Sequence, residues 1–419
     1  MSTADIVSVF AEGTFEQQIQ ELVNYIGRGR SDEDRSALIH PFQDALRTAE
    51  DATPVAEDAG RRQKILSMVI GQVTGLGDGP DKEIEGFFNL LYSHLLAAFP
   101  VDSTELRDHV SSLIQVISSS SAESSIKYRV LSNLFNALPR QSPRRLSVYR
   151  ALLDIATTND ELEVLQISPG DVERWMQEWD VPAEEKSQFL KSISDAFSKS
   201  GQPATAYSYT LPYVRSLPSS SPEAQAAAVD TIAAALRLPI YDFDPLFKLD
   251  AVVASKDHEL FSLLQVFLNG GLSDYKSWEA NHADAFEKYN LDKTHLEQKI
   301  RLLTLASLGF NNIGKDLPYA KIAETLEVEP SQVEKWVIDV IRAGLLSGKL
   351  SQTTQTLHIT RSAARTFEQE QWQALEQRLT AWKAGLANIL EVINAAQKKN
   401  TSEAVTNGTE APAPVQAVA

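Results

Sequence analysis

The sequence predicts an all-α solenoid of helical repeats, followed by a small α+β winged helix and a long C-terminal helix. Three observations support this fold class. Apolar residues recur at three- and four-residue spacing through most of the chain, as on one face of an α-helix. After about residue 309, two short segments alternate in polarity, as strands do. A seven-residue apolar repeat then fills the last predicted helix.

Composition limits the classes of function. The 419-residue chain has the length of two or three domains. It carries 39 Lys and Arg against 56 Asp and Glu, a net charge of −17, and an acidic surface repels nucleic-acid backbones and anionic membranes. The absence of cysteine excludes disulfides, cysteine-bound metals and a cysteine nucleophile. No apolar run reaches the ~18 residues of a membrane span, and the N-terminus does not read as a signal peptide. We expect a soluble, cytoplasmic protein that has no membrane partner.

Helical periodicity dominates the first 310 residues. One stripe contains Leu106, Val110, Leu113 and Ile117, whose spacing puts their side chains on one face of a helix. Serine followed by proline marks three helix starts, because the hydroxyl caps the helix and proline fits its first turn. These pairs are Ser142–Pro143, Ser168–Pro169 and Ser221–Pro222.

Turn sequences separate the apolar stripes. Helices therefore restart about every 20 residues, and two antiparallel helices take about 35–45 residues, the size of a helical repeat unit. No strict sequence repeat is visible, which predicts an irregular solenoid, with a plain all-α bundle as the alternative. We assign residues 1–200 to an N-terminal helical-repeat region and residues 201–310 to a second helical region.

Residues 311–362 have a different pattern. A short helix is predicted over residues 318–326, followed by a turn and a second helix that Gly344 is placed to end. Two segments, 349–352 and the Thr-containing 356–360, alternate in polarity and are separated by three residues, which predicts a β-hairpin. Two helices joined by a turn and followed by a hairpin are typical of a winged helix.

The last predicted helix covers residues 363–397. Its large apolar residues are spaced alternately by three and four, the 3.5-residue period of a coiled-coil or bundle seam. Because one amphipathic helix cannot hide such a seam from water, this face is a candidate subunit interface. The seam residues are Trp372, Leu375, Leu379, Trp382, Leu386, Ile389 and Ile393. Residues 398–419 are rich in Ala, Pro, Thr and Glu, and we predict a disordered tail.

The sequence contains none of the common catalytic motifs. The chain lacks the glycine-rich loops that bind phosphates, the Gly-x-Ser-x-Gly elbow of serine hydrolases and the paired histidines of zinc hydrolases. We therefore predict no catalytic residue, no metal site and no cofactor, and expect that the protein is not an enzyme. An enzyme with an unrecognised site is the alternative.

Charge decides between two uses of the winged helix. A DNA reader needs Lys or Arg on its recognition helix to contact phosphates. Here that helix carries Glu334, Lys335, Asp339 and Arg342, which sum to zero. The sequence favours a protein-docking module, and a nucleic-acid-binding winged-helix protein remains an alternative.

Four arginines surround the helix start at Ser142–Pro143. They are Arg140, Arg144, Arg145 and Arg150, with no acidic residue among them. This cluster is a candidate patch for phosphates or for an acidic partner. A solvated face, or ion pairs to a neighbouring helix, is the alternative interpretation.

Several blocks of sequence, in order, resemble a known family. They are Tyr128–Asn136, Ser142–Arg145, Val172–Trp175 with Trp179, Val333–Asp339, and Gln371–Leu375 with Ala381–Lys383. These blocks and the architecture resemble PCI-domain proteins, and among them the subunit M family of eukaryotic translation initiation factor three. The resemblance covers roughly residues 85–395. It makes residues 201–310 the helical part of a PCI domain and residues 311–362 its winged helix.

The resemblance implies a non-catalytic scaffold subunit. Its winged helix and C-terminal helix would dock other PCI and related subunits of the initiation factor complex. Through that complex the protein would bind the small ribosomal subunit and support recruitment of mRNA and initiator tRNA, with direct RNA contact left open. A PCI subunit of the COP9 signalosome or of the proteasome lid is the alternative within the same class.

Overall fold

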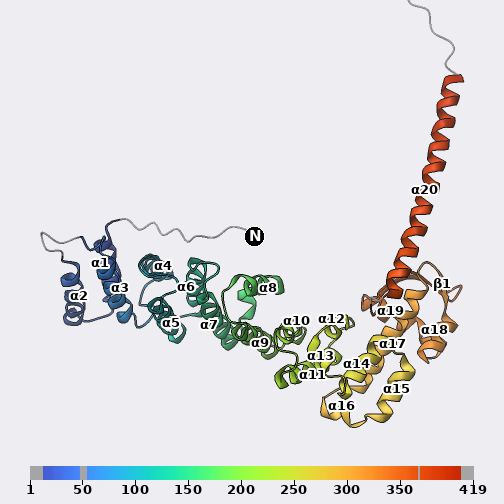
Figure 1. Cartoon of the computed structure of the whole chain (residues 1–419), viewed down its shortest axis with the longest axis horizontal. Helices are drawn as coiled ribbons and strands as arrows, with labels where there is room; N and C mark the ends of the chain where they lie inside the picture. Colours follow the sequence, from blue (N-terminus) through green and yellow to red (C-terminus); the bar gives the residue numbers. More distant parts are fainter. Residues whose placement is uncertain (1–12, 48–53, 367–368, 407–419) are drawn as a thin grey trace, which may run out of the picture. The chain divides into compact units, whose positions relative to one another are not determined.

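The computed structural model describes residues 13–47, 54–366 and 369–406. By its internal contacts the chain forms two compact units, which divide between residues 231 and 232. Each unit is helical, and the strands of the described residues all lie in the second (Figure 1). The predicted fold class, a helical solenoid followed by a winged helix and a long helix, is confirmed. The predicted domain boundaries at residues 200, 310, 362 and 397 remain predictions.

The first unit is a succession of helices in which each one packs on helices close to it in the sequence. For example, α4 contacts α6, α5 contacts α7, α7 contacts α9 and α9 contacts α10. Such short-range packing is what distinguishes a solenoid from a closed bundle. The helices are α1 (Phe15–Ile26), α2 (Asp32–Leu46), α3 (Ala59–Gln72), α4 (Asp81–Ala98), α5 (Thr104–Ser119), α6 (Ser124–Ala137), α7 (Arg144–Asn159), the short 3-10 helix η1 (Leu162–Leu165), α8 (Pro169–Glu178), α9 (Ala183–Lys199), α10 (Pro203–Ser216) and the first part of α11 (Pro222–Arg237). The boundary falls within α11, whose residues from Ile232 onward belong to the second unit.

The Ser–Pro pairs start helices as predicted, with one difference. The hydroxyl of Ser168 accepts from the N–H of Asp171, and that of Ser221 accepts from the N–H of Ala224, so both cap helices that begin at the proline. Ser142 accepts instead from the N–H of Arg144, only two residues on, and α7 begins one residue later than predicted.

The second unit is built around α17 (Lys293–Asn311). This helix contacts α15, α18, α19 and strand β3, and it buries residues on several sides. The surrounding helices before it are α12 (Asp244–Phe247), α13 (Asp250–Ala254), α14 (Glu259–Asn269), α15 (Leu272–Asn281) and α16 (Asp284–Lys288). The buried residues of α17 are therefore not confined to one narrow stripe of the helix.

One buried residue of α17 is a lysine. Lys299 is 1% exposed, and its ammonium donates to the carbonyls of Ala235 at 2.7 Å, Leu236 at 3.3 Å and Leu238 at 2.7 Å. These carbonyls lie at the C-terminal end of α11, where the helix leaves its last carbonyls without internal partners. Lys299 therefore caps α11 and joins it to α17. Burial lowers the pKa of Lys299 to about 7.

The winged helix consists of α18 (Tyr319–Leu326), the 3-10 turn η2 (Pro330–Gln332), α19 (Val333–Arg342) and three strands. Gly344 follows α19 with φ +73°, the left-handed conformation predicted for a residue that ends a helix. The hairpin strands β2 (Leu346–Ser351) and β3 (Thr356–Ser362) pair as predicted but are longer. Sequence analysis did not predict β1 (Asp316–Pro318), which pairs with the other side of β3.

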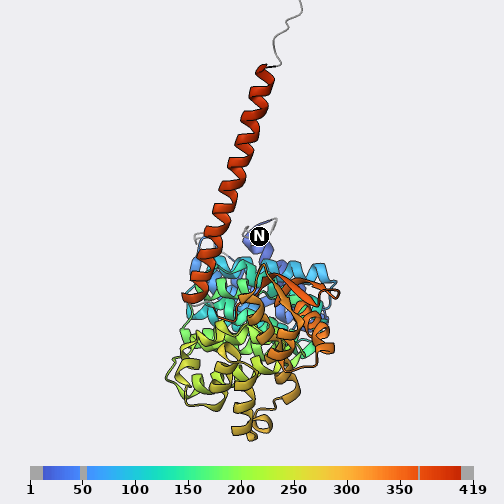
Figure 2. The ribbon, with the colours of Figure 1, turned by 90° about the vertical axis from the view of Figure 1, so that its right-hand side faces the viewer.

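The last element is α20 (Gln369–Thr406), a single continuous helix drawn in red (Figure 2). It extends beyond the predicted end at residue 397, because the residues that follow include Lys, Ala and Glu, which favour helix over coil. Of the predicted disordered tail, 398–419, residues 407–419 lie outside the described residues.

Candidate subunit interface

The seam of α20 is exposed along its length. All seven predicted seam residues lie on this helix, and between 37% and 67% of each is exposed to solvent. Trp382 is 67% exposed and Leu379 is 53% exposed, although side chains of this kind are normally buried in soluble proteins. A continuous apolar face of this kind is typical of protein–protein interaction surfaces, so the seam stays a candidate subunit interface.

The apolar face is wider than the sequence analysis recognised. Leu390 and Val392, which lie outside the strict heptad positions, are 59% and 69% exposed. They lie on either side of the stripe formed by Leu386, Ile389 and Ile393. A broad face is typical of a helix that packs against more than one neighbour, whereas the narrow seam alone suits a two-stranded coiled coil.

A half-buried arginine holds the segment just before α20. The guanidinium of Arg365 donates to the carbonyls of Leu303 at 3.0 Å and Gly270 at 2.6 Å, and to the hydroxyl of Thr304 at 3.2 Å. Burial lowers the pKa of Arg365 to about 10, so the side chain stays charged at neutral pH. Arg365 therefore fastens the chain to α14 and α17 immediately before the candidate interface helix begins.

A second arginine holds α20 itself. Arg378 donates to the carbonyl of Phe310 at 2.9 Å, and its guanidinium carbon lies 4.9 Å from the centre of the Phe310 ring. Phe310 belongs to the last turn of α17, whose carbonyls have no helical partners. The first turns of α20 are thus attached to the second unit, whereas Leu379 to Ile393 carry the exposed stripe. No local signal in the sequence marked Arg365 or Arg378 for this role.

The winged helix presents two further surfaces. On α19, Lys335, Ile338 and Arg342 are exposed, and Ile338 is an apolar side chain 41% open to solvent. The sheet has the order β1-β3-β2, so β2 is an edge strand and its outer backbone groups pair with no strand among the described residues. An unpaired strand edge can accept a strand from another chain.

The four predicted patch arginines are not equally available. Arg145 is 9% exposed: its guanidinium donates to the carbonyl of Leu138 at 3.0 and 2.8 Å and lies 4.6 Å from the centre of the Phe135 ring. Arg150 donates to the carbonyl of Glu185 at 3.0 Å. Arg140 is exposed and Arg144 is half-buried. Two of the four guanidinium groups thus bind backbone carbonyls, and the patch remains a prediction.

In the described part of the chain, no three His, Asp or Glu side chains gather in a way that could hold a metal ion. Among the same residues no helix combines the length and the apolar character needed to cross a bilayer.

Two family models match the C-terminal half of the chain. The model described as the PCI domain matches residues 278–361, which run from α15 to β3. The model described as eIF3 subunit M, C-terminal helix, matches residues 365–393. The second match begins at Arg365 and ends at Ile393, the last residue of the apolar seam. It therefore covers the anchor and the exposed face together.

Several relatives match nearly the whole chain. A protein of Phaeosphaeria nodorum is 32% identical over 408 residues, which cover 94% of this chain and 90% of the relative. A protein of Aspergillus oryzae is 30% identical over 429 residues, with 96% and 90% covered. A protein of Coccidioides immitis is 30% identical over 420 residues, with 95% and 90% covered. Each is named eukaryotic translation initiation factor 3 subunit M. These matches confirm the resemblance seen in the sequence, and the chain belongs to the family of eukaryotic translation initiation factor 3 subunit M.

Proposed function

We propose that this protein is a non-catalytic scaffold subunit of a cytoplasmic initiation factor 3 complex, in which it docks other subunits through α20 and the winged helix. The observation that carries the proposal is the apolar face of α20, which lies within the segment that matches the C-terminal helix of subunit M. A helix with such a face is unfavourable in water unless partner helices cover it.

The winged helix supplies the second docking surface in this proposal. The outer edge of β2 offers main-chain donors and acceptors, and Leu350, 38% exposed, adds an apolar contact on the same strand. The charge of α19 sums to zero, so this module is suited to protein rather than to nucleic acid. Through the assembled complex, the protein would support binding of the small ribosomal subunit and recruitment of mRNA and initiator tRNA.

Replacing Leu379 and Leu386 with alanine should release partner subunits without unfolding the chain. The two side chains are 53% and 42% exposed in the free chain, so their removal takes little from its own core. In a complex they would be buried, where each Leu→Ala substitution costs about 2–5 kcal/mol. We therefore expect a loss of affinity of at least about a hundredfold. The measurement is co-purification of initiation factor subunits with the tagged full-length chain, together with its melting temperature.

The matched control replaces Gln377 and Glu391 with alanine. Both residues are exposed on α20 outside the seam. This control should keep its partners, and both double variants should melt at the wild-type temperature. Undiminished recovery of partners by the Leu379→Ala/Leu386→Ala variant would refute docking through the seam. Recovery of signalosome or proteasome-lid subunits in place of initiation factor subunits would refute the assignment of the complex.

A further inference from the structure

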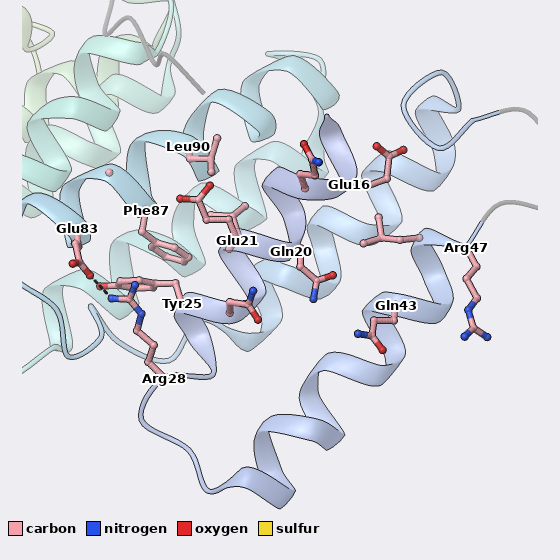
Figure 3. A pocket seen from close by; sticks show the side chains of 15 residues that line it. Glu16, Gln20, Glu21, Tyr25, Arg28, Gln43, Arg47, Glu83, Phe87 and Leu90 are labelled. Carbon is pink, nitrogen blue, oxygen red and sulfur yellow. Dashed lines mark hydrogen bonds and ion pairs between the residues drawn. The ribbon is translucent and has the colours of Figure 1, made fainter. Parts of the chain in front are cut away.

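A groove of about 1050 Å³ lies over the outer face of α1 in the first unit (Figure 3). Helix α1 contacts both α2 and α4, and residues of all three helices line the groove. The groove is independent of α20 and of the winged helix. Its lining combines amide groups, aromatic and aliphatic side chains, and carboxylates.

The amide groups come from Gln20 and Asn24 on α1 and from Gln43 on α2. Gln20 and Asn24 are four residues apart and so lie on one face of the helix. None of the three side chains forms a hydrogen bond to another residue of the described chain. Each amide carries both a donor and an acceptor, the same pair that a peptide unit presents. A row of free amides is therefore matched to the main chain of an extended peptide. A bound helix would have no free main-chain groups to offer them.

The apolar part of the groove is preformed. The ring of Tyr25 stacks on Phe87 with centres 4.4 Å apart and 20° between the planes, and its hydroxyl donates to the carbonyl of Leu76 at 2.8 Å. Leu46 and Leu90 continue this surface on α2 and α4. Because Tyr25 is held at both its ring and its hydroxyl, a ligand would not have to order it on binding.

The unbalanced charge in the groove is negative. Glu83 forms an ion pair with Arg28 at one end, so that carboxylate is already neutralised (Figure 3). Glu16 and Glu21 also line the groove and form no ion pair with any described residue. Arg47, at the other end, has Asp44 as a partner 3.6 Å away. A ligand with Lys or Arg would complement the two free carboxylates.

A glycine leaves the backbone of α4 open to the groove. Gly86 lies within the helix, where glycine is about 1 kcal/mol less favourable than alanine. A Cβ atom added at Gly86 would meet nothing within 4 Å. The chain itself therefore does not require glycine for space, and the position is free to admit a ligand close to the helix.

We propose that this groove binds an extended, basic segment of a partner protein. Its main chain would pair with the free amides, an apolar side chain would pack on Tyr25 and Phe87, and a Lys or Arg would face Glu16 and Glu21. The N-terminal residues of this chain, 1–12, do not fit the charge, because they contain Asp5 and Glu12 but no Lys or Arg. The occupant is therefore a second protein.

The test uses fluorescence anisotropy with the full-length chain and a labelled hexapeptide of alternating lysine and leucine. We expect saturable binding that weakens with salt. The Gly86→Leu variant adds a side chain in the groove, starting from a Cβ position with nothing within 4 Å. We expect its affinity to fall by about tenfold or more, equivalent to at least 1.4 kcal/mol. The matched control, Gly170→Leu on α8, also adds a side chain where nothing lies within 4 Å, and should bind like the wild type. The Glu16→Gln/Glu21→Gln variant should bind more weakly and depend less on salt.

Several outcomes would overturn the proposal. One is the absence of saturable binding by the wild type, and another is equal binding by the two glycine variants. A peptide of alternating glutamate and leucine that binds as tightly would refute the charge argument. If deletion of residues 1–12 raises the affinity tenfold, the groove is occupied by this chain's own N-terminus and not by a partner.

Discussion

Replacing Lys299 with methionine is expected to lower the free energy of unfolding of the second unit by about 2–4 kcal/mol at pH 7. Methionine has nearly the same length and volume as lysine, so it leaves no large cavity. What it removes is the donor to the carbonyls of Ala235 and Leu236, two residues with no exposed surface. A buried acceptor that loses its donor has given up its hydrogen bonds to water without a replacement, which lowers the stability of the folded chain.

The stability difference between the wild type and Lys299→Met should also depend on pH, in a direction that the pKa of Lys299 determines. The pKa of Lys299 is about 7 in the folded chain, whereas an unfolded lysine has a pKa of ~10.4. Between these values the unfolded chain binds a proton that the folded chain has released. Unfolding therefore takes up a proton, and the stability that Lys299 confers rises with pH across this window. The stability difference between the wild type and Lys299→Met should widen from pH 7 to pH 9.

Native-state hydrogen exchange followed by mass spectrometry is the suitable measurement, because a chain of two units need not unfold in one transition. Amides of α17 and of the last turn of α11 report on the affected contact. The matched control is Lys293→Met, an exposed lysine of the same helix that pairs with Glu279, and it should change stability by less than about 1 kcal/mol. A Lys299→Met chain as stable as the wild type, or a difference that narrows with pH, would contradict the capping role.

Local patterns in the sequence were sufficient for much of the fold. The heptad of α20, the helix starts at Ser168 and Ser221 and the glycine that ends α19 all depend on interactions within a few residues of the chain. Strand β1 was missed because it has three residues, ends at Pro318 and is held by pairing with a strand some forty residues later. Nothing in its own pattern distinguishes it from a loop.

Three cations that bind backbone carbonyls were not recognised from the sequence, for one physical reason. Arginine and lysine read as surface residues, yet Arg145, Lys299 and Arg365 each donate to backbone carbonyls inside their unit. A Lys or Arg side chain becomes buried when tertiary folding brings backbone carbonyls to it. For Lys299 these carbonyls lie 61 to 64 residues away in the sequence. Periodicity could identify the exposed stripe of α20, but it could not show which residues attach that helix to the rest of the unit.

The substitution Arg365→Met should destabilise the second unit by about 2–4 kcal/mol, because three acceptors, one of them on the buried Leu303, lose a charged donor. Arg365→Lys should restore only part of this, since a single ammonium cannot reproduce the planar fork that reaches Leu303, Thr304 and Gly270 together. Thermal unfolding and hydrogen exchange of α14 and α17 would measure both effects. An Arg365→Met chain with unchanged protection in these helices would contradict the anchoring role.

The seam variants and Arg365→Met should differ in their effects on partner binding and on the stability of the free chain. Seam variants remove contacts that exist only in the complex, so they should abolish partner binding and leave the melting temperature unchanged. Arg365→Met leaves every seam residue in place and loosens its attachment, so the partner must then order the helix as it binds. That cost is expected to weaken binding by only about tenfold, or roughly 1.4 kcal/mol, while the free chain loses stability. If Arg365→Met instead abolishes binding as fully as the seam variant does, the partner must also contact the base of α20, and the interface begins at Arg365.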